Sequence, residues 1–219
     1  MTAASAAFGD TWKAEDVAFW DRIWAKHCGS SMTEAILAEV EQASSVVEIG
    51  CGAGHLIHEA VARGWRGTYT GIEISQVATD CATRRLRRRE GGDGAYFVCA
   101  DFMDVARRGP ARRGITHLDV AAADLVISRG VLQHQVHWMP MVVAALRFAP
   151  RVVMGIGYTT DCPDRHLGGW HRSGHYDVRV SLPCLRAEAA AAAVPLRSVR
   201  EYPNAKRPNH QEALAVFAK

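Results

Sequence analysis

A short apolar run in this sequence leads directly into three glycines, in the segment SSVVEIGCGAGHLI of residues 44–57. The β-branched part of the run is typical of a buried strand, and the residues after the glycines have the spacing of a helix that ends at Gly64. A turn that leaves a parallel strand and enters a helix presents free N–H groups and the positive end of the helix dipole. Glycine allows positive φ angles there and close approach of a ligand to the backbone. We therefore expect Gly50, Gly52 and Gly54 to mark a binding site for a flat or anionic ligand.

Predicted strands and helices alternate along the middle of the chain. Four further strands are indicated by short apolar runs at residues 67–74, 95–100, 122–128 and 151–157. Helices are predicted at residues 55–64, 76–90 (capped by Ser75) and 130–149. This alternation favours a doubly wound α/β fold, with a parallel sheet and helices on both of its faces.

The two ends of the chain add elements to this core. Val17, Trp20 and Trp24 have the spacing of an amphipathic helix. A second helix is predicted to open at Ser31, which has a glutamate, Glu34, at capping-box spacing. Near the other end we expect a helix at residues 182–194 behind a capping Ser181, and a closing hairpin at residues 196–202 and 212–219.

Composition narrows the class of protein. The 219 residues suit one domain, and 48% hydrophobic with 22% charged residues is a globular balance. No apolar run approaches the roughly 18 residues of a membrane span, and the first ten residues have no signal-peptide pattern. The six cysteines are scattered without a C-x-x-C pair, which favours reduced thiols and a cytoplasmic location. A net charge of +3 does not by itself imply nucleic acid.

The spacing of the glycines separates two nucleotide-type cofactors. The dinucleotide fingerprint G-x-G-x-x-G, counted from Gly50, requires a glycine at position 55, where the chain has His55. An NAD-linked oxidoreductase is therefore disfavoured. The pattern present is E-x-G-x-G-x-G, from Glu48 to Gly54, and it resembles the S-adenosylmethionine loop of class I methyltransferases. The resemblance implies that the turn lies against the methionine and ribose of the cofactor, with Glu48 near the amino-acid end.

Later residues extend the resemblance over roughly residues 44–157. Glu73, 25 residues after Glu48, ends the second strand, where a carboxylate can accept two hydrogen bonds from a ribose diol. Asp101 follows the third strand and would face the adenine. Residues 124–134, DLVISRGVLQH, resemble the fourth-strand motif that forms the floor under the sulfonium. A structural role at the start of the strand is the alternative for Asp124. The implied cofactor-binding residues are Glu48, Gly50, Cys51, Gly52, Gly54, Glu73, Ile74, Asp101, Phe102, Ser128 and Arg129.

The family resemblance also implies a fold and a domain layout. We expect a Rossmann-like, seven-stranded, mostly parallel sheet with a reversed last hairpin. Residues 1–43 would form a helical segment that covers the cofactor, and residues 44–219 the methyltransferase domain. Residues 158–180, rich in His, Gly and aromatic residues, would be an insertion after the fifth strand that acts as an acceptor lid.

Methyl transfer from a sulfonium is a direct displacement, so the enzyme mainly aligns the reactants and excludes water. A base is needed only where the acceptor must lose a proton. The candidate catalytic residues are His134, His137 and His171, although each histidine could instead be structural. Candidate substrate-binding residues are Tyr158, Trp170, His175 and Tyr176. No metal is predicted, because the spacing of the lid histidines matches no closed zinc pattern.

The acceptor is predicted to be a small molecule methylated on oxygen or nitrogen, such as a natural product or a sugar-like compound. A nucleic-acid methyltransferase is an alternative, because arginines cluster at residues 84–89 and 107–113. However, the N-P-P-Y motif of base-amine methyltransferases is absent, and SRGV stands in its place at residues 128–131. A non-catalytic cofactor-binding protein is a second alternative, which the intact Glu48, Glu73 and Asp101 disfavour. No membrane partner is expected, and the oligomeric state stays open.

Overall fold

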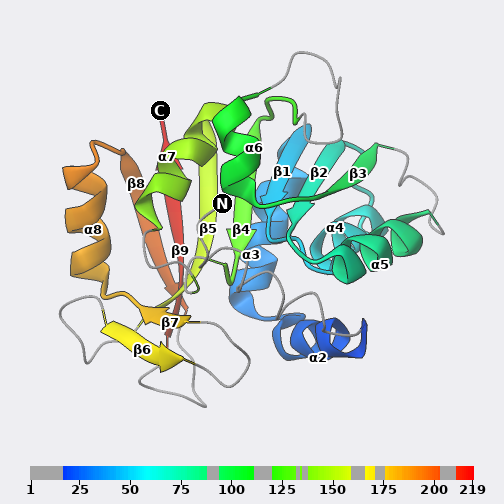
Figure 1. The fold of residues 1–219 in the computed structure, drawn as a ribbon, viewed down its shortest axis with the longest axis horizontal. Helices are drawn as coiled ribbons and strands as arrows, with labels where there is room; N and C mark the ends of the chain where they lie inside the picture. Colours follow the sequence, from blue (N-terminus) through cyan, green and yellow to red (C-terminus); the bar gives the residue numbers. More distant parts are fainter. Residues whose placement is uncertain are drawn as a thin grey trace.

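The computed structural model describes residues 17–87, 94–110, 120–131, 134, 138–158, 166–170, 176–202 and 211–219. These residues form a seven-stranded sheet with the strand order β3-β2-β1-β4-β5-β9-β8 (Figure 1). The strands are β1 (Ser45–Ile49), β2 (Thr68–Glu73), β3 (Ala95–Cys99), β4 (Leu125–Arg129), β5 (Arg151–Tyr158), β8 (Leu196–Tyr202) and β9 (Gln211–Ala218). Strands β1 to β5 pair with one another in parallel, and β9 pairs antiparallel with both β5 and β8. The predicted Rossmann-like, mostly parallel sheet is confirmed, including the reversed hairpin.

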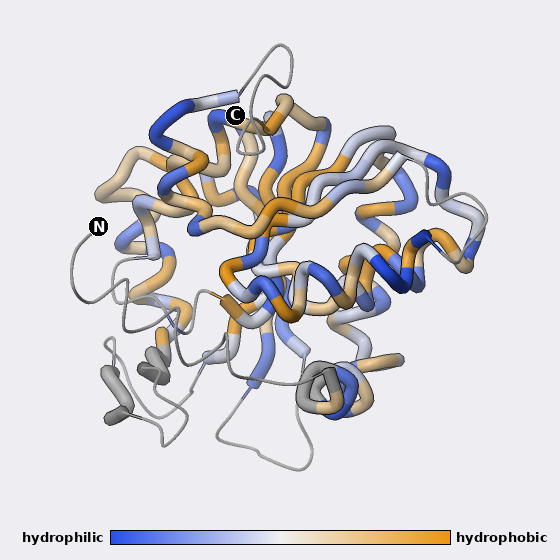
Figure 2. Tube along the Cα trace, turned by 45° about the vertical axis from the view of Figure 1, so that its right-hand side comes forward, coloured by the Kyte–Doolittle hydropathy of each residue, from blue (hydrophilic) through white to orange (hydrophobic). Residues whose placement is uncertain are grey.

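Helices cover both faces of the sheet, because alternate strand residues are apolar on each face (Figure 2). One face packs against α3 (Ser31–Glu41), α4 (His55–Ala62) and α5 (Gln76–Leu86). The opposite face packs against α6 (Phe102–Arg108), α7 (Met139–Phe148) and α8 (Leu182–Ala191). Within the described residues, none of the helices is long and apolar enough to cross a membrane.

Two predicted helix starts are wrong. The N-cap of α3 is Ser30 and not Ser31: its Oγ accepts from the Thr33 N–H at 3.2 Å because its extended backbone turns the side chain toward the first turn. Glu34 binds Arg63 instead of completing a capping box. The helix predicted from residue 130 begins only at Met139 in α7, where a proline in the first turn needs no N–H partner.

Other boundaries follow the sequence closely. Ser75 and Ser181 cap α5 and α8 as predicted. The short helix α6 is an element that the sequence reading missed, although its cap, Asp101, is visible in the sequence. Free thiols are found at Cys28, Cys51, Cys81, Cys99 and Cys184, and the sixth, Cys162, lies outside the described residues.

The predicted insertion contains a hairpin, β6 (His166–Trp170) paired with β7 (Tyr176–Arg179). It lies at the end of the sheet where the parallel strands finish, on the same side as α2 (Val17–His27) (Figure 1). In an open α/β sheet this carboxyl edge is where ligands bind. Both segments that the sequence predicts to be covers therefore lie beside the expected site.

The opposite edge of the sheet is braced by Asp124, directly before β4. Its Oδ2 accepts from the Ser44 N–H (3.0 Å), the Ser44 hydroxyl (2.5 Å) and the Ser45 N–H (3.0 Å). These bonds lower the pKa of the Asp124 carboxyl. Because Asp124 ties β4 to β1 at the amino ends of the strands, the structure supports its structural interpretation.

We expect Asp124→Ala to reduce the free energy of unfolding by about 1 kcal/mol at pH 7, a small value because the side chain is exposed. A lowered folded-state pKa gives stability that is present above the unfolded-state value and lost as pH falls through the folded one. The difference from wild type should therefore shrink below about pH 4. Urea unfolding measures it, with Asp80→Ala, which removes only a bond within α5, as the control. A constant difference at all pH values would contradict this assignment.

Candidate cofactor and acceptor site

The turn between β1 and α4 has the backbone geometry that its glycines predict. Gly50, Gly52 and Gly54 have φ angles of 72°, 52° and 72°. Gly54 is the N-cap of α4 and gives the helix no side-chain cap, so the first turn keeps N–H groups for another partner. A Cβ on Gly50 would lie 2.1 Å from Val131 Cγ2. The glycine at position 50 therefore also serves the close approach of the loop after β4.

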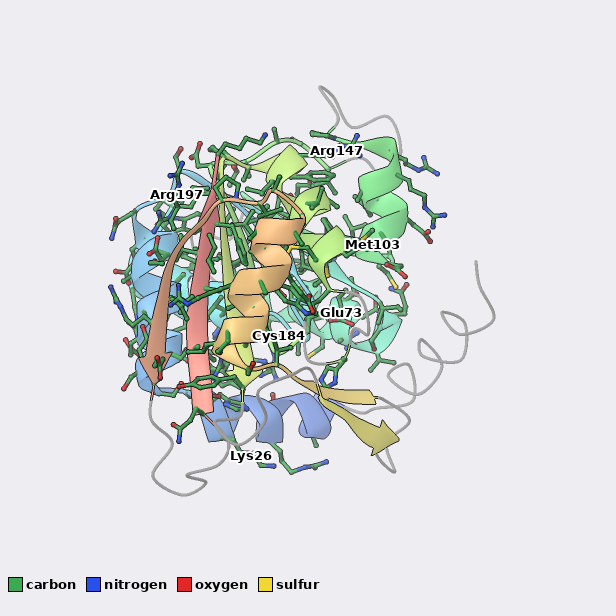
Figure 3. All side chains as sticks on the ribbon, turned by 90° about the vertical axis from the view of Figure 1, so that its left-hand side faces the viewer. Lys26, Glu73, Met103, Arg147, Cys184 and Arg197 are labelled. Carbon is green, nitrogen blue, oxygen red and sulfur yellow. The ribbon has the colours of Figure 1, made fainter. Side chains whose placement is uncertain are left out.

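Glu73 connects the end of β2 to this turn. Its Oε2 accepts from the Gly52 N–H and its Oε1 from the Ser75 N–H, both at 2.9 Å. The residue is only 5% exposed, and burial raises the pKa of its carboxyl while the backbone N–H bonds oppose that rise. Figure 3 shows Glu73 inside the molecule, toward the end that carries α2 and the β6–β7 hairpin. Each carboxylate oxygen has two lone pairs, so each retains capacity for one ligand hydroxyl.

Glu48 is held within the sheet face instead of in the turn. The Tyr69 hydroxyl donates to Glu48 Oε2 at 2.5 Å, and the carboxyl is 4% exposed. Burial raises the pKa of Glu48 to about 7, against the opposing effects of Tyr69 and Arg129. Burial also raises the pKa of the neighbouring Cys51 thiol. A role of Glu48 at the amino-acid end of a cofactor stays a prediction, and no pattern in the sequence indicates its partner Tyr69.

The third and fourth strands end in residues with roles in the protein itself. Asp101 caps α6 by accepting from the Met103 N–H at 2.8 Å. Phe102 is 5% exposed and packs on Phe148 at 5.8 Å between ring centroids, so its contact with an adenine stays a prediction. The Ser128 hydroxyl donates to the Ile49 carbonyl at 3.0 Å. This bond connects the end of β4 to the start of the glycine turn.

Beyond β4 the chain approaches the glycine turn through Val131, and His134 follows. The His134 N–H donates to the Val131 carbonyl at 2.9 Å, and the residue is half-buried. The role of His134 beside the sulfonium stays a prediction. The other two candidate bases, His137 and His171, lie outside the described residues.

The predicted acceptor residues are placed only in part. Tyr158 ends β5 and is 3% exposed. Its hydroxyl donates to Glu201 at 2.5 Å, and burial raises its pKa to about 12. Trp170 and Tyr176 are partners in the β6–β7 hairpin, which brings their backbones together, and His175 lies outside the described residues.

Helix α2 is fastened beside the glycine turn by residues that the sequence reading did not identify. His55, the first residue of α4, stacks on Trp24 with a ring centroid distance of 5.4 Å. His55 Nε2 lies 2.9 Å from Asp21 Oδ1, and Arg85 binds both of these residues. The sequence signal was present in the Trp24 spacing, but the partners lie far along the chain.

Within the described residues no group of three or more His, Cys, Asp or Glu side chains could hold a metal ion. A surface groove of about 560 Å³ runs between α7 and α8, lined by Met139, Val143, Arg147, Glu188 and their neighbours. It contains none of the predicted site residues.

The fold and the glycine turn define a Rossmann-like domain that presents a cofactor site at the carboxyl edge of its sheet. In a comparison with known proteins, residues 47–153 match the family model described as a methyltransferase domain. The predicted resemblance to the class I methyltransferases is confirmed for these residues, and the predicted cofactor, S-adenosylmethionine, agrees with the S-adenosylhomocysteine in two solved structures of this fold.

Three individual proteins illustrate the similarity. The Mycobacterium tuberculosis protein Rv1506c is named as a proposed methyltransferase. It is 32% identical to this chain over 80 residues, which cover 36% of this chain and 46% of that protein. The chain thus spans less than half of this relative. The geranyl diphosphate C-methyltransferase of Streptomyces coelicolor superposes with a TM-score of 0.72 at 15% identity, covering 99% and 98% of the two chains. The Burkholderia thailandensis 1,6-didemethyltoxoflavin-N1-methyltransferase superposes with 0.66 at 18% identity, covering 98% and 88%.

The raised pKa of Glu48 predicts a pH dependence of stability. A carboxyl that titrates near pH 7 in the folded state and near 4.5 when unfolded binds more protons when folded, so stability falls as pH rises between these values. Glu48→Gln keeps an acceptor for Tyr69 and has no titrating carboxyl. It should therefore not lose the stability, about 3 kcal/mol, that wild type loses as pH rises. Urea unfolding at pH 5 and pH 8 should show the variant gaining on wild type at the higher pH. The control is the exposed Glu41→Gln, and parallel behaviour of Glu48→Gln and wild type would contradict the burial argument.

Proposed function

We propose that this protein is an S-adenosylmethionine-dependent methyltransferase that acts on a small molecule. The observation that carries the proposal is the bond from Gly52 to Glu73, because it places an oriented carboxylate beside a glycine turn. The residues fit the cofactor: the turn supplies backbone N–H groups, and Glu73 keeps acceptor capacity for two ribose hydroxyls. Asp101 at the end of β3 supports the same assignment as the adenine contact.

The bound cofactor would supply an electrophilic methyl group on a sulfonium. The protein would bind and orient it with Glu73, Asp101 and the glycine turn, and would exclude water with α2 and the β6–β7 hairpin. His134 is the described candidate for a base, and it would accept a proton from a hydroxyl or ammonium acceptor. The remaining candidates, His137 and His171, are the alternatives for the same role.

We infer an acceptor that is methylated on oxygen or nitrogen and is of natural-product or sugar type, bound under the lid of residues 158–180. The support is the lid composition, with Trp170 and Tyr176 paired in its hairpin. The two solved neighbours act, by their names, on a carbon of geranyl diphosphate and on a nitrogen of a toxoflavin precursor, which supports a small acceptor without fixing the atom. A cytoplasmic location is part of the same proposal.

Calorimetric titration of the purified protein with S-adenosylhomocysteine, with NAD in parallel, tests the cofactor. We expect micromolar binding of the first and no heat from the second. Glu73→Gln should weaken binding by about 1–3 kcal/mol because it replaces a charged acceptor, whereas the exposed Glu41→Gln should not. Unchanged affinity in Glu73→Gln would mean that the ribose lies elsewhere.

The two alternative functions predict different results in binding and activity assays. A nucleic-acid methyltransferase would bind an oligonucleotide with a steep salt dependence. A non-catalytic protein would bind S-adenosylhomocysteine yet release no product with any panel of amines, phenols and sugars.

We propose further that α2 covers the cofactor, as expected for residues 1–43. Trp24→Ala removes the ring that stacks on His55, so α2 should close less often and binding of S-adenosylhomocysteine should weaken by about tenfold, or ~1.4 kcal/mol. Lys26→Ala is the matched control, because Lys26 lies on the same helix and points away from the sheet (Figure 3). Equal affinity of both variants and wild type would overturn the cover assignment.

A further inference from the structure

Arg129 differs in its burial from the described arginines that pair with a carboxylate. Arg63, Arg85, Arg107 and Arg151 each contact a carboxylate. Arg129 is more deeply placed, and burial lowers the pKa of its guanidinium, yet in the described residues it has no carboxylate within 4.0 Å. Its Nη2 lies a long 3.4 Å from the Ser30 hydroxyl. A partly buried guanidinium whose Nε is buried without a partner is costly, so its retention calls for an explanation.

A second buried donor on the same face of the sheet lacks a partner. The buried atoms without a hydrogen bond include Arg129 Nε and the Tyr202 hydroxyl. Arg129 ends β4 two residues after Ile127, which places its side chain on the α3 side of the sheet. Tyr202 ends β8 and packs against the core cluster that contains Ile127, so it lies on the same side. Buried donors normally find a partner, so two in one region indicate an absent acceptor.

Glu212 of β9 lies between these two donors. It is the register partner of both Tyr202 in β8 and Gly157 in β5, and Arg129 is the register partner of Gly155. The Glu212 carboxylate is within electrostatic range of Arg129 and lies 3.6 Å from His27 Nδ1. We call Arg129, Tyr202, Glu212 and His27 the Arg129 cluster.

The family resemblance implies a cofactor contact for Arg129, but the Arg129 cluster lies farther along the carboxyl edge than the other proposed cofactor contacts. Those contacts, Gly52, Glu73 and Asp101, follow β1, β2 and β3, whereas the cluster lies over β4, β5, β9 and β8. The β6–β7 hairpin follows β5, and α2 contributes His27. The cluster is therefore placed where an acceptor would lie under the lid.

We propose that the Arg129 cluster binds a carboxylate group of the methyl acceptor. This proposal rests on the proposed function. The planar guanidinium can hold a carboxylate with two parallel N–H bonds, and the Tyr202 hydroxyl is a further donor. Glu212 stands next to the site and repels additional negative charge, which favours a monoanionic carboxylate over a doubly charged phosphate. Burial lowers the pKa of His27 to about 4, assisted by Arg129 and Lys26, so this histidine is neutral near pH 7.

The test uses the full chain with ¹⁵N-labelled arginine side chains and follows the Nε–H signals by NMR. Sodium acetate is titrated at constant ionic strength, with and without saturating S-adenosylhomocysteine. We expect acetate to shift the Arg129 signal saturably while the cofactor is bound, and inorganic phosphate to bind at least tenfold more weakly. The variants at position 129 lack this signal, so acetate binding to the variants is measured by calorimetry. Arg129→Gln should abolish acetate binding, Arg129→Lys should weaken it at least tenfold, and Tyr202→Phe should weaken it severalfold.

Arg151→Gln is the matched control, because Arg151 is an exposed arginine already paired with Glu39. Arg129→Gln should remain folded, since the guanidinium makes no ion pair, and its thermal melt checks this. Absence of acetate binding, or phosphate binding tighter than acetate, would overturn the proposal. It would also be overturned if Arg129→Gln weakened S-adenosylhomocysteine but not 5′-methylthioadenosine, because the guanidinium would then hold the cofactor's own carboxylate. Acetate binding in a protein that binds no S-adenosylhomocysteine would refute the proposed function and leave the anion site standing.

Discussion

The contact on which the carboxyl edge depends is the short bridge between Glu73 and the Gly52 N–H. It joins the end of β2 to the turn after β1, and the same carboxylate accepts from Ser75 at the start of α5. One buried charged group thus orients a turn, a strand end and a helix start. A charge held by two N–H groups in the interior is strong and directional, which makes it a suitable fixed point for a ligand.

The remaining polar groups of the edge are arranged around this point. Glu48 lies deeper on the same face of the sheet, and its carboxyl accepts a hydrogen bond from Tyr69. This carboxyl therefore neighbours the site but already has a partner within the protein. Ser128 ties β4 to Ile49 on the other side of the turn. The turn is therefore held from both neighbouring strands. In addition to their positive φ angles, Gly50 and Gly54 leave room for the close approach of Val131 and Ala82, respectively.

The sequence predicts the fold well because its signals are local. Strand order follows from the family resemblance, while apolar runs and the capping residues Ser75 and Ser181 mark most boundaries. What it missed depends on distant partners. Nothing near Glu48 in the sequence announces Tyr69, and nothing near Trp24 announces His55. Ser30 and Ser31 are equally good caps by type, and only the backbone angle at Ser30 decides between them.

The two halves of the carboxyl edge differ in charge, and this difference bears on where the methyl donor and the acceptor would bind. Buried carboxyl groups, Glu48 and Glu73, lie over β1 and β2, and in their ionised forms they would favour a cationic sulfonium. The unpaired guanidinium of Arg129 ends β4, next to these strands, where a cation would be repelled and an anion attracted. A cationic methyl donor and an anionic acceptor would thus be sorted to opposite sides of the β1–β4 boundary. The strand order of the sheet reverses at that boundary, and ligands of open α/β sheets bind at this position.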